Sequence, residues 1–145
     1  MIRRLGLADL PALLELERLS QLVSWTEAAL RDELTHVDGD VFGIGDPLVG
    51  HVCLRRILDE LWILNLATHP QHRRMGIATR LIAVAKQQAT STSTSLWLEV
   101  REGNVAARAL YEREGLAPVG RRPGYYPGLP PATEREAAIL MMRKL

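Results

Sequence analysis

The stretch QHRRMGIATRLI, residues 71–82, places two arginines and a glycine directly before a segment with helical apolar spacing. A helix N-terminus exposes N–H groups that have no partner within the helix. A glycine at this point lets a ligand approach the backbone closely, and arginine side chains add positive charge. The stretch therefore predicts a loop that binds an anion, most simply a phosphate, where a helix begins.

The segments on either side of this loop predict a strand–helix–strand unit. ELWILNLAT, residues 60–68, is a nearly continuous apolar run typical of a central strand buried on both faces. Apolar residues then recur at helical spacing from Gly76 to Ala89, and the polar run TSTSTS, residues 90–95, should end this helix as a flexible loop. SLWLEV, residues 95–100, is the next buried strand, so the unit should form a right-handed parallel crossover.

The rest of the chain predicts helices and antiparallel strands around this unit. Asp9 is a suitable N-cap for a first helix, Ser24-x-x-Glu27 matches a capping box for a second, and Asn104 and Gly115 should begin and end a fourth. Strands are expected at residues 1–5, twice within 38–60, briefly from 116, where a long Pro/Gly loop follows, and at 136–145. The expected fold is α/β (α+β), a mixed central sheet with helices on both faces, in one domain spanning residues 1–145.

Composition argues against a nucleic-acid-binding protein and against a membrane protein. The chain has 145 residues, of which 47% are hydrophobic and 24% charged, with a formal net charge of +1. A charge so close to neutral gives no case for direct nucleic-acid binding, and no apolar run is long enough to cross a membrane. Asp9 and Glu15 interrupt the N-terminal apolar residues, which argues against a signal peptide. A single cysteine, Cys53, fits a reducing, cytoplasmic setting and should be a small buried strand residue.

Two common phosphate-binding motifs do not match the loop. A P-loop needs Gly-x-x-x-x-Gly-Lys followed by Ser or Thr, and the sequence contains no such string. A dinucleotide site of the Rossmann type needs Gly-x-Gly-x-x-Gly and an acidic residue about twenty positions later. Glu99 does end the next strand, but the first two glycines are missing, and HPQHRR is too long and too basic for that tight turn.

A third motif does match. RRMGIA, residues 73–78, fits Arg/Gln-x-x-Gly-x-Gly/Ala, and the chain resembles the GCN5-related N-acetyltransferase (GNAT) family. LWLEVREGNVAARALYEREGL, GRRPGYYP and EREAAILM continue the resemblance, which covers almost the whole chain and is strongest from Asp59 to Pro127. Together with Trp25 and Thr26, these segments are similar to the branch that acetylates the N-terminal alanine of bacterial ribosomal proteins.

The resemblance implies acetyl-coenzyme A as cosubstrate and a sheet whose central strands splay apart. The pantetheine arm would pair with the freed strand edge at Leu66, Ala67 and Thr68. The pyrophosphate would lie in the loop and first helical turn, at Arg73, Arg74, Met75, Gly76, Ile77, Ala78 and Thr79. Ala78 stands where many relatives have glycine and is small enough to keep this approach open. Asn104 would contact the cosubstrate by resemblance, or serve as an N-cap alone.

The resemblance also implies roles for an acid and a base. Glu99 would be the base that takes the proton of the amine, and Tyr111 the acid for the leaving thiolate, since a phenol near pKa 10 can protonate it. The alternatives are a solvated carboxylate at a strand end and a tyrosine packed on the core. Trp25, Tyr125 and Tyr126 would line the acceptor cleft, although YYP can also be a packed turn.

These residues predict an N-acetyltransferase that acts on the α-amine of a protein N-terminus, with an alanine-first ribosomal protein as the favoured acceptor. The alternatives are the same chemistry on a lysine side chain or a small amine, and a non-catalytic acyl-coenzyme A sensor. Transfer should be direct, within a ternary complex, because Cys53 shows no base partner in the sequence. No metal is expected, because the spacing of His69, His72 and Cys53 matches no zinc pattern.

Overall fold

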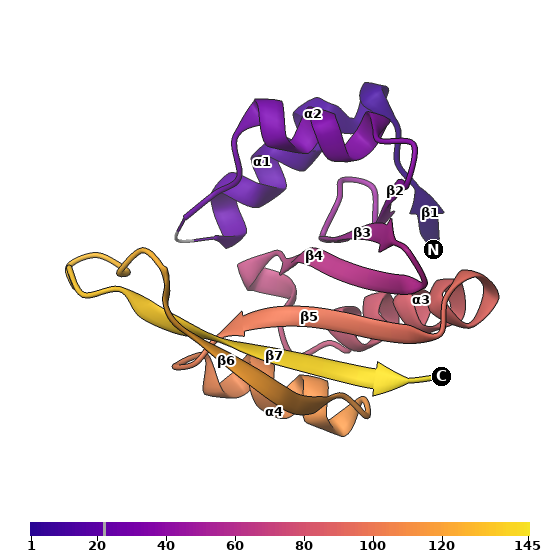
Figure 1. Cartoon of the computed structure of the whole chain (residues 1–145). Coiled ribbons are helices and arrows are strands. Elements are labelled where there is room, and N and C mark those ends of the chain that lie inside the picture. The colour runs from indigo at the N-terminus through magenta and orange to yellow at the C-terminus, as the bar shows by residue number, and fades with distance from the viewer. Residues whose placement is uncertain (22) are drawn as a thin grey trace.

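Seven strands form one mixed sheet in the computed structural model, which describes residues 1–21 and 23–145 (Figure 1). The sheet order is β1-β2-β3-β4-β5-β7-β6, in which β4 and β5 are parallel and the other neighbours are antiparallel. The strands are β1 (Ile2–Arg4), β2 (Gly39–Ile44), β3 (Gly50–Ile57), β4 (Glu60–Thr68), β5 (Ser95–Arg101), β6 (Ala117–Tyr126) and β7 (Glu136–Lys144). The helices are α1 (Leu10–Ser20), α2 (Glu27–Thr35), α3 (Ile77–Thr92) and α4 (Val105–Arg113), with short 3-10 turns at Leu7–Asp9 and Pro70–His72.

Helices cover both faces of the sheet, as predicted, and each face has its own apolar core (Figure 1). One core joins α3 and α4 to the central strands. Its members on α3 are the predicted inward residues Ile77, Leu81, Ile82, Ala85 and Ala89. The other core joins α1 and α2 to β2 and β3 through leucines that include Leu13, Leu16 and Leu30. The helix pairs therefore hold the central strands from opposite sides.

The start of α3 lies very close to β3. A Cβ atom on Gly50 would come within 2.6 Å of Cγ2 of Ile77, so only glycine allows this approach. Because Ile77 is the first residue of α3, the contact fixes the height of the helix N-terminus above the sheet. The loop that precedes α3 is therefore seated against the end of β4.

A β-bulge interrupts β4 in the middle of the sheet. Cys53 of β3 pairs with Asn65 and the next residue, Leu54, pairs with Ile63, which leaves Leu64 as the extra residue. Leu61, Ile63 and Leu66 pack on the α3 side, whereas Leu64 packs with the core under α1. Pairing between β4 and β5 runs from Glu60 and Ser95 to Ile63 and Leu98 and, in the described chain, goes no further. The two central strands therefore splay at the bulge, which confirms the expected fold class.

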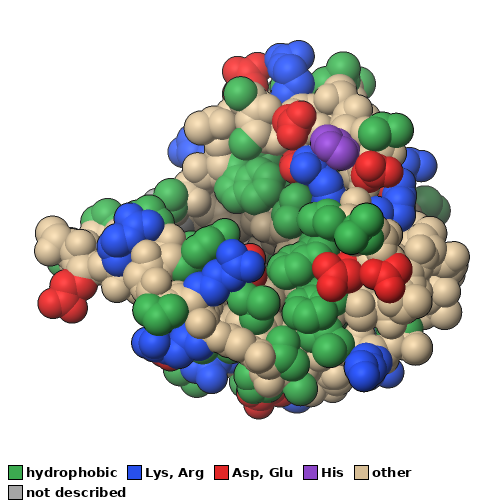
Figure 2. Space-filling model, in the orientation of Figure 1, with side chains coloured by type: hydrophobic (Ala, Val, Ile, Leu, Met, Phe, Trp, Pro, Cys, Tyr) green, Lys and Arg blue, Asp and Glu red, His purple; other side chains and the backbone are tan. Residues whose placement is uncertain are grey.

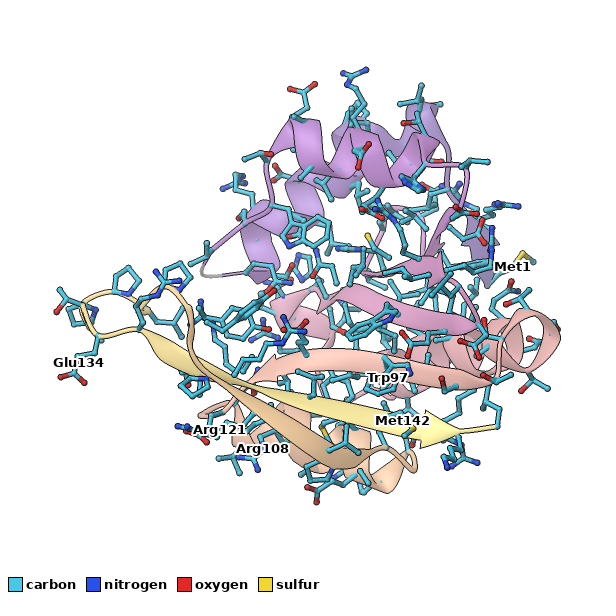
Figure 3. All side chains as sticks on the ribbon, in the orientation of Figure 1. Met1, Trp97, Arg108, Arg121, Glu134 and Met142 are labelled. Atoms are coloured by element: carbon cyan, nitrogen blue, oxygen red, sulfur yellow. The ribbon has the colours of Figure 1, made fainter. Side chains whose placement is uncertain are left out.

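The prediction that β4 is buried on both faces was wrong. Buried and half-buried residues alternate along the strand, and Trp62 lies on the less covered face. Its ring stacks on Trp97 of β5 with centroids 5.4 Å apart. Met142 of β7 pairs with Trp97, and both side chains lie on the viewer's side of the sheet (Figure 3). Figure 2 shows hydrophobic side chains gathered on this face over β4, β5 and β7, which explains the continuous apolar run.

Three other local predictions need correction. α3 continues through Thr92, and the amide of Ser93 still donates to the carbonyl of Ala89. The hydroxyls of Thr90, Ser91 and Thr92 are accommodated because each donates to the carbonyl four residues earlier, at 2.8–3.1 Å. Only residues 93 and 94 of TSTSTS connect this helix to β5.

The second correction concerns the start of α2. The N-cap is Thr26, whose Oγ1 accepts from the amide of Ala29 at 3.1 Å, rather than Ser24 of the expected capping box. Ser24 instead donates its hydroxyl to the carbonyl of Glu17 at 3.3 Å. The third correction is that β6 extends to Tyr126, because its residues pair with β7 where a loop was expected. None of the helices described is long and apolar enough to cross a membrane.

Candidate active site

The loop between β4 and α3 has a backbone shape suited to an anion. Arg74 has φ = 64° and Gly76 has φ = 78°. Two of the four residues 73–76 are therefore left-handed. Left-handed residues that alternate with others turn successive N–H groups toward one side, which forms an anion-binding nest. A Cβ on Gly76 would meet no atom within 4 Å, so the space above the loop is open. These features match the predicted phosphate loop.

The first turn of α3 adds further unpaired donors to this loop. The amide of Arg80 donates to the carbonyl of Gly76 at 3.0 Å, which is the start of the helical hydrogen bonding. The amides of Ile77, Ala78 and Thr79 precede it and lie at the positive end of the helix dipole. The predicted residues of the loop thus form one continuous backbone surface.

Arg73 and Arg74 have different surroundings. Nη2 of Arg73 donates to the carbonyl of Ser20 at 3.0 Å, which ties the loop to the last turn of α1. Arg74 and Met75 are exposed to solvent. Because the guanidinium of Arg73 is engaged by the protein itself, the anion site depends mainly on backbone amides.

The end of β4 presents a strand edge beside this loop. Leu66, Ala67 and Thr68 pair with β3 on one side, opposite Val52, His51 and Gly50. On the other side, the described residues of β5 have already left β4 at the bulge. This edge therefore has no partner strand in the described chain, and the carbonyl of Leu66 lies 3.5 Å from Nε2 of Gln21.

Glu99 is held on β5 just beyond the splay. Its side chain is 17% exposed, so most of this carboxylate is shielded from solvent. Its Oε2 is buried with no hydrogen-bond partner in the described chain, and Nε of Arg122 lies 4.0 Å away. A buried carboxylate oxygen without a donor is costly, and such groups are typical of functional sites.

A buried tyrosine, Tyr111, and a half-buried one, Tyr126, have raised pKa values. Burial raises the pKa of Tyr111 to about 12, above the value near 10 expected from the sequence. Burial also raises the pKa of Tyr126 to about 12, and the nearby carboxylate of Glu99 and the phenol of Tyr111 add to the effect. Tyr126 therefore lies near enough to Glu99 and to Tyr111 for both to affect its pKa. The phenols of Tyr111 and Tyr126 keep their protons at neutral pH and can act as hydrogen-bond donors.

Tyr125 and Tyr126 end the strand β6 rather than lying in a loop. Their rings meet edge to face with centroids 5.0 Å apart, and the guanidinium of Arg101 lies 4.6 Å from the centroid of Tyr126. Tyr125 is 43% exposed, with Arg122 over its ring at 5.4 Å. The pair thus forms an aromatic wall with cationic neighbours on the side of Glu99.

Comparison with known proteins identifies the family of this chain. The model of the Acetyltransferase (GNAT) family matches residues 10–116. The chain belongs to the GNAT family.

Several GNAT proteins align with nearly the whole chain. The [Ribosomal protein bS18]-alanine N-acetyltransferase of Haemophilus ducreyi is 31% identical, over 97% of each chain. The crystal structure of the ribosomal-protein-S18-alanine N-acetyltransferase from Escherichia coli is 28% identical, with a TM-score of 0.90 over 99% of this chain and 92% of that one. Arabidopsis thaliana NAA60 in complex with acetyl-CoA shares the fold, at 18% identity and a TM-score of 0.86 over 100% and 98% of the two chains.

Within this GNAT fold, two predicted residues have mainly local contacts. Oδ1 of Asn104 accepts from the amide of Ala107 at 3.2 Å, so Asn104 is the N-cap of α4, as expected. Trp25 lies before α2 and packs, half-buried, against the core under α1. That Asn104 contacts the cosubstrate and that Trp25 lines the acceptor cleft remain predictions.

The sequence did not reveal a buried polar cluster beneath α1. Glu17 and His51 are 0% exposed, and Nε2 of His51 lies 3.0 Å from Oε1 of Glu17. Nδ2 of Asn65 donates to the same carboxylate oxygen. One signal was available, because Glu17 falls at helical spacing from the buried Leu10 and Leu13 on the apolar face of α1.

The expectation that Cys53 has no base partner was also wrong. Its Sγ lies 3.7 Å from Nδ1 of His51, because residues two apart on a strand share one face. Burial, with the charges of Glu33 and Glu17, raises the pKa of the Cys53 thiol well above its usual range. The thiol is therefore protonated and inaccessible, and this cysteine is not a nucleophile.

The described residues contain no group of three or more His, Cys, Asp or Glu side chains arranged to hold a metal. His69 and His72 contact each other edge to face with ring centroids 5.3 Å apart, and Nδ1 of His69 accepts from the amide of Gln71. These two histidines therefore shape the start of the loop.

The left-handed residues generate a prediction for coenzyme A binding. Gly76→Val should weaken the affinity about tenfold or more, because a β-branched residue disfavours this conformation and its side chain would fill the open space. Gly120→Val on β6 is the matched control, since that glycine is not left-handed and a Cβ there would meet only Leu140 at 3.7 Å, so the affinity should stay within about twofold. Isothermal titration calorimetry measures both. A folded Gly76→Val variant with wild-type affinity would contradict the nest.

The buried phenol of Tyr111 generates a prediction for alkaline stability. The folded chain binds this proton up to about pH 12, whereas the unfolded chain loses it near pH 10. Stability should therefore fall as the pH rises through this window, by up to about 2–3 kcal/mol from this group. Urea unfolding at a series of pH values should show a smaller fall for Tyr111→Phe and a wild-type fall for the exposed control Tyr125→Phe. Equal falls in all three proteins would refute the assignment.

Proposed function

We propose that this GNAT protein transfers the acetyl group of acetyl-coenzyme A to the α-amine of a protein N-terminus, and that an alanine-first ribosomal protein is its acceptor. The observation that carries the proposal is the buried, unpartnered Oε2 of Glu99 beside the open edge of β4. The relatives named as acetyltransferases of ribosomal protein bS18 support the acceptor, because they align over nearly the whole chain.

The cosubstrate would be held mainly by backbone. The amides from Arg73 to Thr79 would bind the pyrophosphate, and the edge from Leu66 to Thr68 would pair with the pantetheine arm, while Asn104 would contact it from α4. Acetyl-coenzyme A supplies the acetyl thioester when bound. The open space above Gly76 and the free strand edge support this fit, as does the neighbour of the same fold solved with acetyl-CoA.

Glu99 would act as the general base. Its Oε2 accepts no hydrogen bond from the described residues. It could therefore accept a proton from the ammonium group of the acceptor, directly or through water. An α-amine has a pKa near 7.7–8.0 and a lysine ε-amine near 10.4, so the lysine costs roughly 3 kcal/mol more to deprotonate. A single carboxylate suits the easier of these two tasks.

Tyr111 would assist the leaving sulfur as a hydrogen-bond donor. With its pKa raised to about 12, complete transfer of its proton to a thiolate of pKa about 8.5 is uphill by roughly 4–5 kcal/mol. A hydrogen bond from the phenol stabilises the thiolate without that cost. Transfer would be direct, because the Cys53 thiol is buried and protonated on the α1 side of the sheet.

The acceptor would approach from the side of the tyrosines. Trp25 and the wall formed by Tyr125 and Tyr126 would flank the chain that leads to Glu99. This arrangement leaves room for a small first side chain such as alanine. Retention of both Glu99 and Tyr111 beside an intact loop argues against a non-catalytic sensor.

Removal of the base gives a direct test of the mechanism. Glu99→Gln should lower kcat by about a hundredfold or more and remove the acidic limb of the pH–rate profile. Glu102→Gln is the control, because that carboxylate is 41% exposed and pairs with Arg121 at 2.7 Å, away from the splay. Steady-state release of coenzyme A over a range of pH measures both variants. Equal rates for Glu99→Gln and wild type would show that another group or water removes the proton.

The acceptor is tested with one peptide in two forms. An alanine-first peptide with an internal lysine should be acetylated at its N-terminus, and the same peptide with a blocked N-terminus should react far more slowly. Mass spectrometry identifies the modified amine. Acetylation of the blocked peptide on lysine at an equal rate would favour the lysine alternative, whereas acetylation of neither form would rule out a peptide acceptor.

A further inference from the structure

A buried carboxylate outside the proposed acid–base pair lies behind the open strand edge. Glu17 of α1 is 0% exposed and three N–H donors converge on it. Nε2 of His51 lies 3.0 Å from its Oε1, Nδ2 of Asn65 donates to the same oxygen, and the amide of Trp25 lies 3.5 Å from its Oε2. Burying a carboxylate is costly unless donors surround it, so this set of contacts holds its members in place.

The contacts of Glu17 connect the parts of the proposed site. Asn65 follows the β4 bulge, and its Oδ1 accepts from Nε2 of Gln21 at 3.1 Å. The same nitrogen of Gln21 lies 3.5 Å from the carbonyl of Leu66, on the strand edge assigned to the pantetheine arm. The amide of Trp25 belongs to the segment assigned to the acceptor.

A second link reaches the pyrophosphate loop. One helical turn after Glu17, the carbonyl of Ser20 accepts from Arg73 of that loop at 3.0 Å. The last turn of α1 therefore touches the loop, the strand edge and the segment before α2. Glu17 is its fully buried charged member.

We propose that Glu17 is a positioning residue for acetyl transfer, which acts through Asn65, Gln21 and the Trp25 backbone to hold the acetyl-binding edge of β4 in register with the acceptor segment. It touches neither substrate. The part that concerns Trp25 rests on the proposed function, whereas the part that concerns β4 rests on the fold alone.

The chemistry of the cluster requires a carboxylate at position 17, because only an acceptor at both oxygens satisfies the donors on both sides. In Glu17→Gln, the side-chain amide can be oriented in two ways. In one orientation its nitrogen faces the side-chain nitrogen of Asn65, and in the other it faces the backbone amide of Trp25, so two donors meet in each case. Rotation of the Asn65 and Gln21 amides can relieve the first clash, but then the Gln21 oxygen faces the Leu66 carbonyl. Each outcome loses a contact to the strand edge or to the acceptor segment.

Glu17→Gln should therefore lower kcat/KM about tenfold to a hundredfold, the size expected when reacting groups are misplaced by a small distance. Hydrogen–deuterium exchange should become faster in the segment 65–68 of the free enzyme. Calorimetric affinity for coenzyme A should change less than about threefold, because the backbone nest is intact.

The matched control is Glu33→Gln, which also removes a buried helix carboxylate on the same face of the sheet. Glu33 is 5% exposed and pairs with Arg55 at 2.5 Å. Arg55 pairs with Trp62, which precedes the bulge on β4, whereas Asn65 and the edge 66–68 follow it. This variant should lose stability but keep both kcat/KM and the exchange of residues 65–68. Equal effects of the two substitutions on activity and exchange would reduce Glu17 to a stability residue and overturn the proposal.

A charge swap gives the sharper test. In Glu17→Gln/Asn65→Asp, the amide introduced at position 17 can donate to the carboxylate introduced at position 65, which also accepts from Gln21. His51 then adopts its other neutral tautomer and accepts from the same amide. The swap should restore most of kcat/KM and the slow exchange. A double variant no better than Glu17→Gln would overturn the proposal.

Gln21→Ala provides a variant that is safe for folding, because Gln21 is half-exposed at the end of α1. It should speed exchange at residues 65–68 and lower kcat/KM several-fold, and wild-type behaviour in both would count against the proposal. The exchange measurement needs no acceptor. A wild-type protein inactive on peptides would thus refute the proposed acceptor, while the role of Glu17 at β4 would still be decided.

Discussion

The backbone of β4 imposes the constraint on which the site depends. A buried strand must pair its N–H and C=O groups on both edges, and an inserted residue breaks that pairing locally. The bulge at Leu64 coincides with the end of the β4–β5 ladder at Ile63 and Leu98. The groups of β4 beyond it have no partner strand in the described chain, and Glu99 lies on the part of β5 that no longer pairs with β4. The proposed site thus begins where one extra residue interrupts the sheet.

The two sides of the proposed site differ in whether backbone or side chains form them. The side assigned to the cosubstrate consists of backbone amides and a strand edge, so its shape depends on left-handed positions and on close packing at Gly50 more than on particular side chains. The side assigned to the acceptor consists of Trp25, Tyr125 and Tyr126. Side chains change readily by substitution whereas backbone shapes do not, so one cofactor site can be combined with many acceptors. The fold shared with relatives below one-fifth identity is consistent with this division.

Local signals predicted much of this arrangement from the sequence. The phosphate loop, the inward residues of α3 and the Asn104 cap all follow from residues within one or two turns of each other. The bulge did not follow, because Leu64 is an ordinary strand former and the insertion is defined only relative to β3. Pairing with β7 extended β6 to Tyr126, into the first part of the expected Pro/Gly loop, and α3 ran on to Thr92 through the polar run. The contact between Cys53 and His51, and the site of Glu17, required the tertiary packing of α1 on the sheet.

Gly50 affects how ordered the first turn of α3 is before a ligand binds. The absence of a side chain there lets Ile77 settle against β3, and this contact anchors the first turn of α3 before any ligand arrives. Ordering a loop residue from many conformations to one costs about 1–2 kcal/mol of conformational entropy. In this protein the packing of Ile77 against β3 orders the first turn of α3 during folding, through apolar contacts. If the proposed loop binds the pyrophosphate, Gly50 would then favour binding without contact to the ligand, because less entropy remains to be lost.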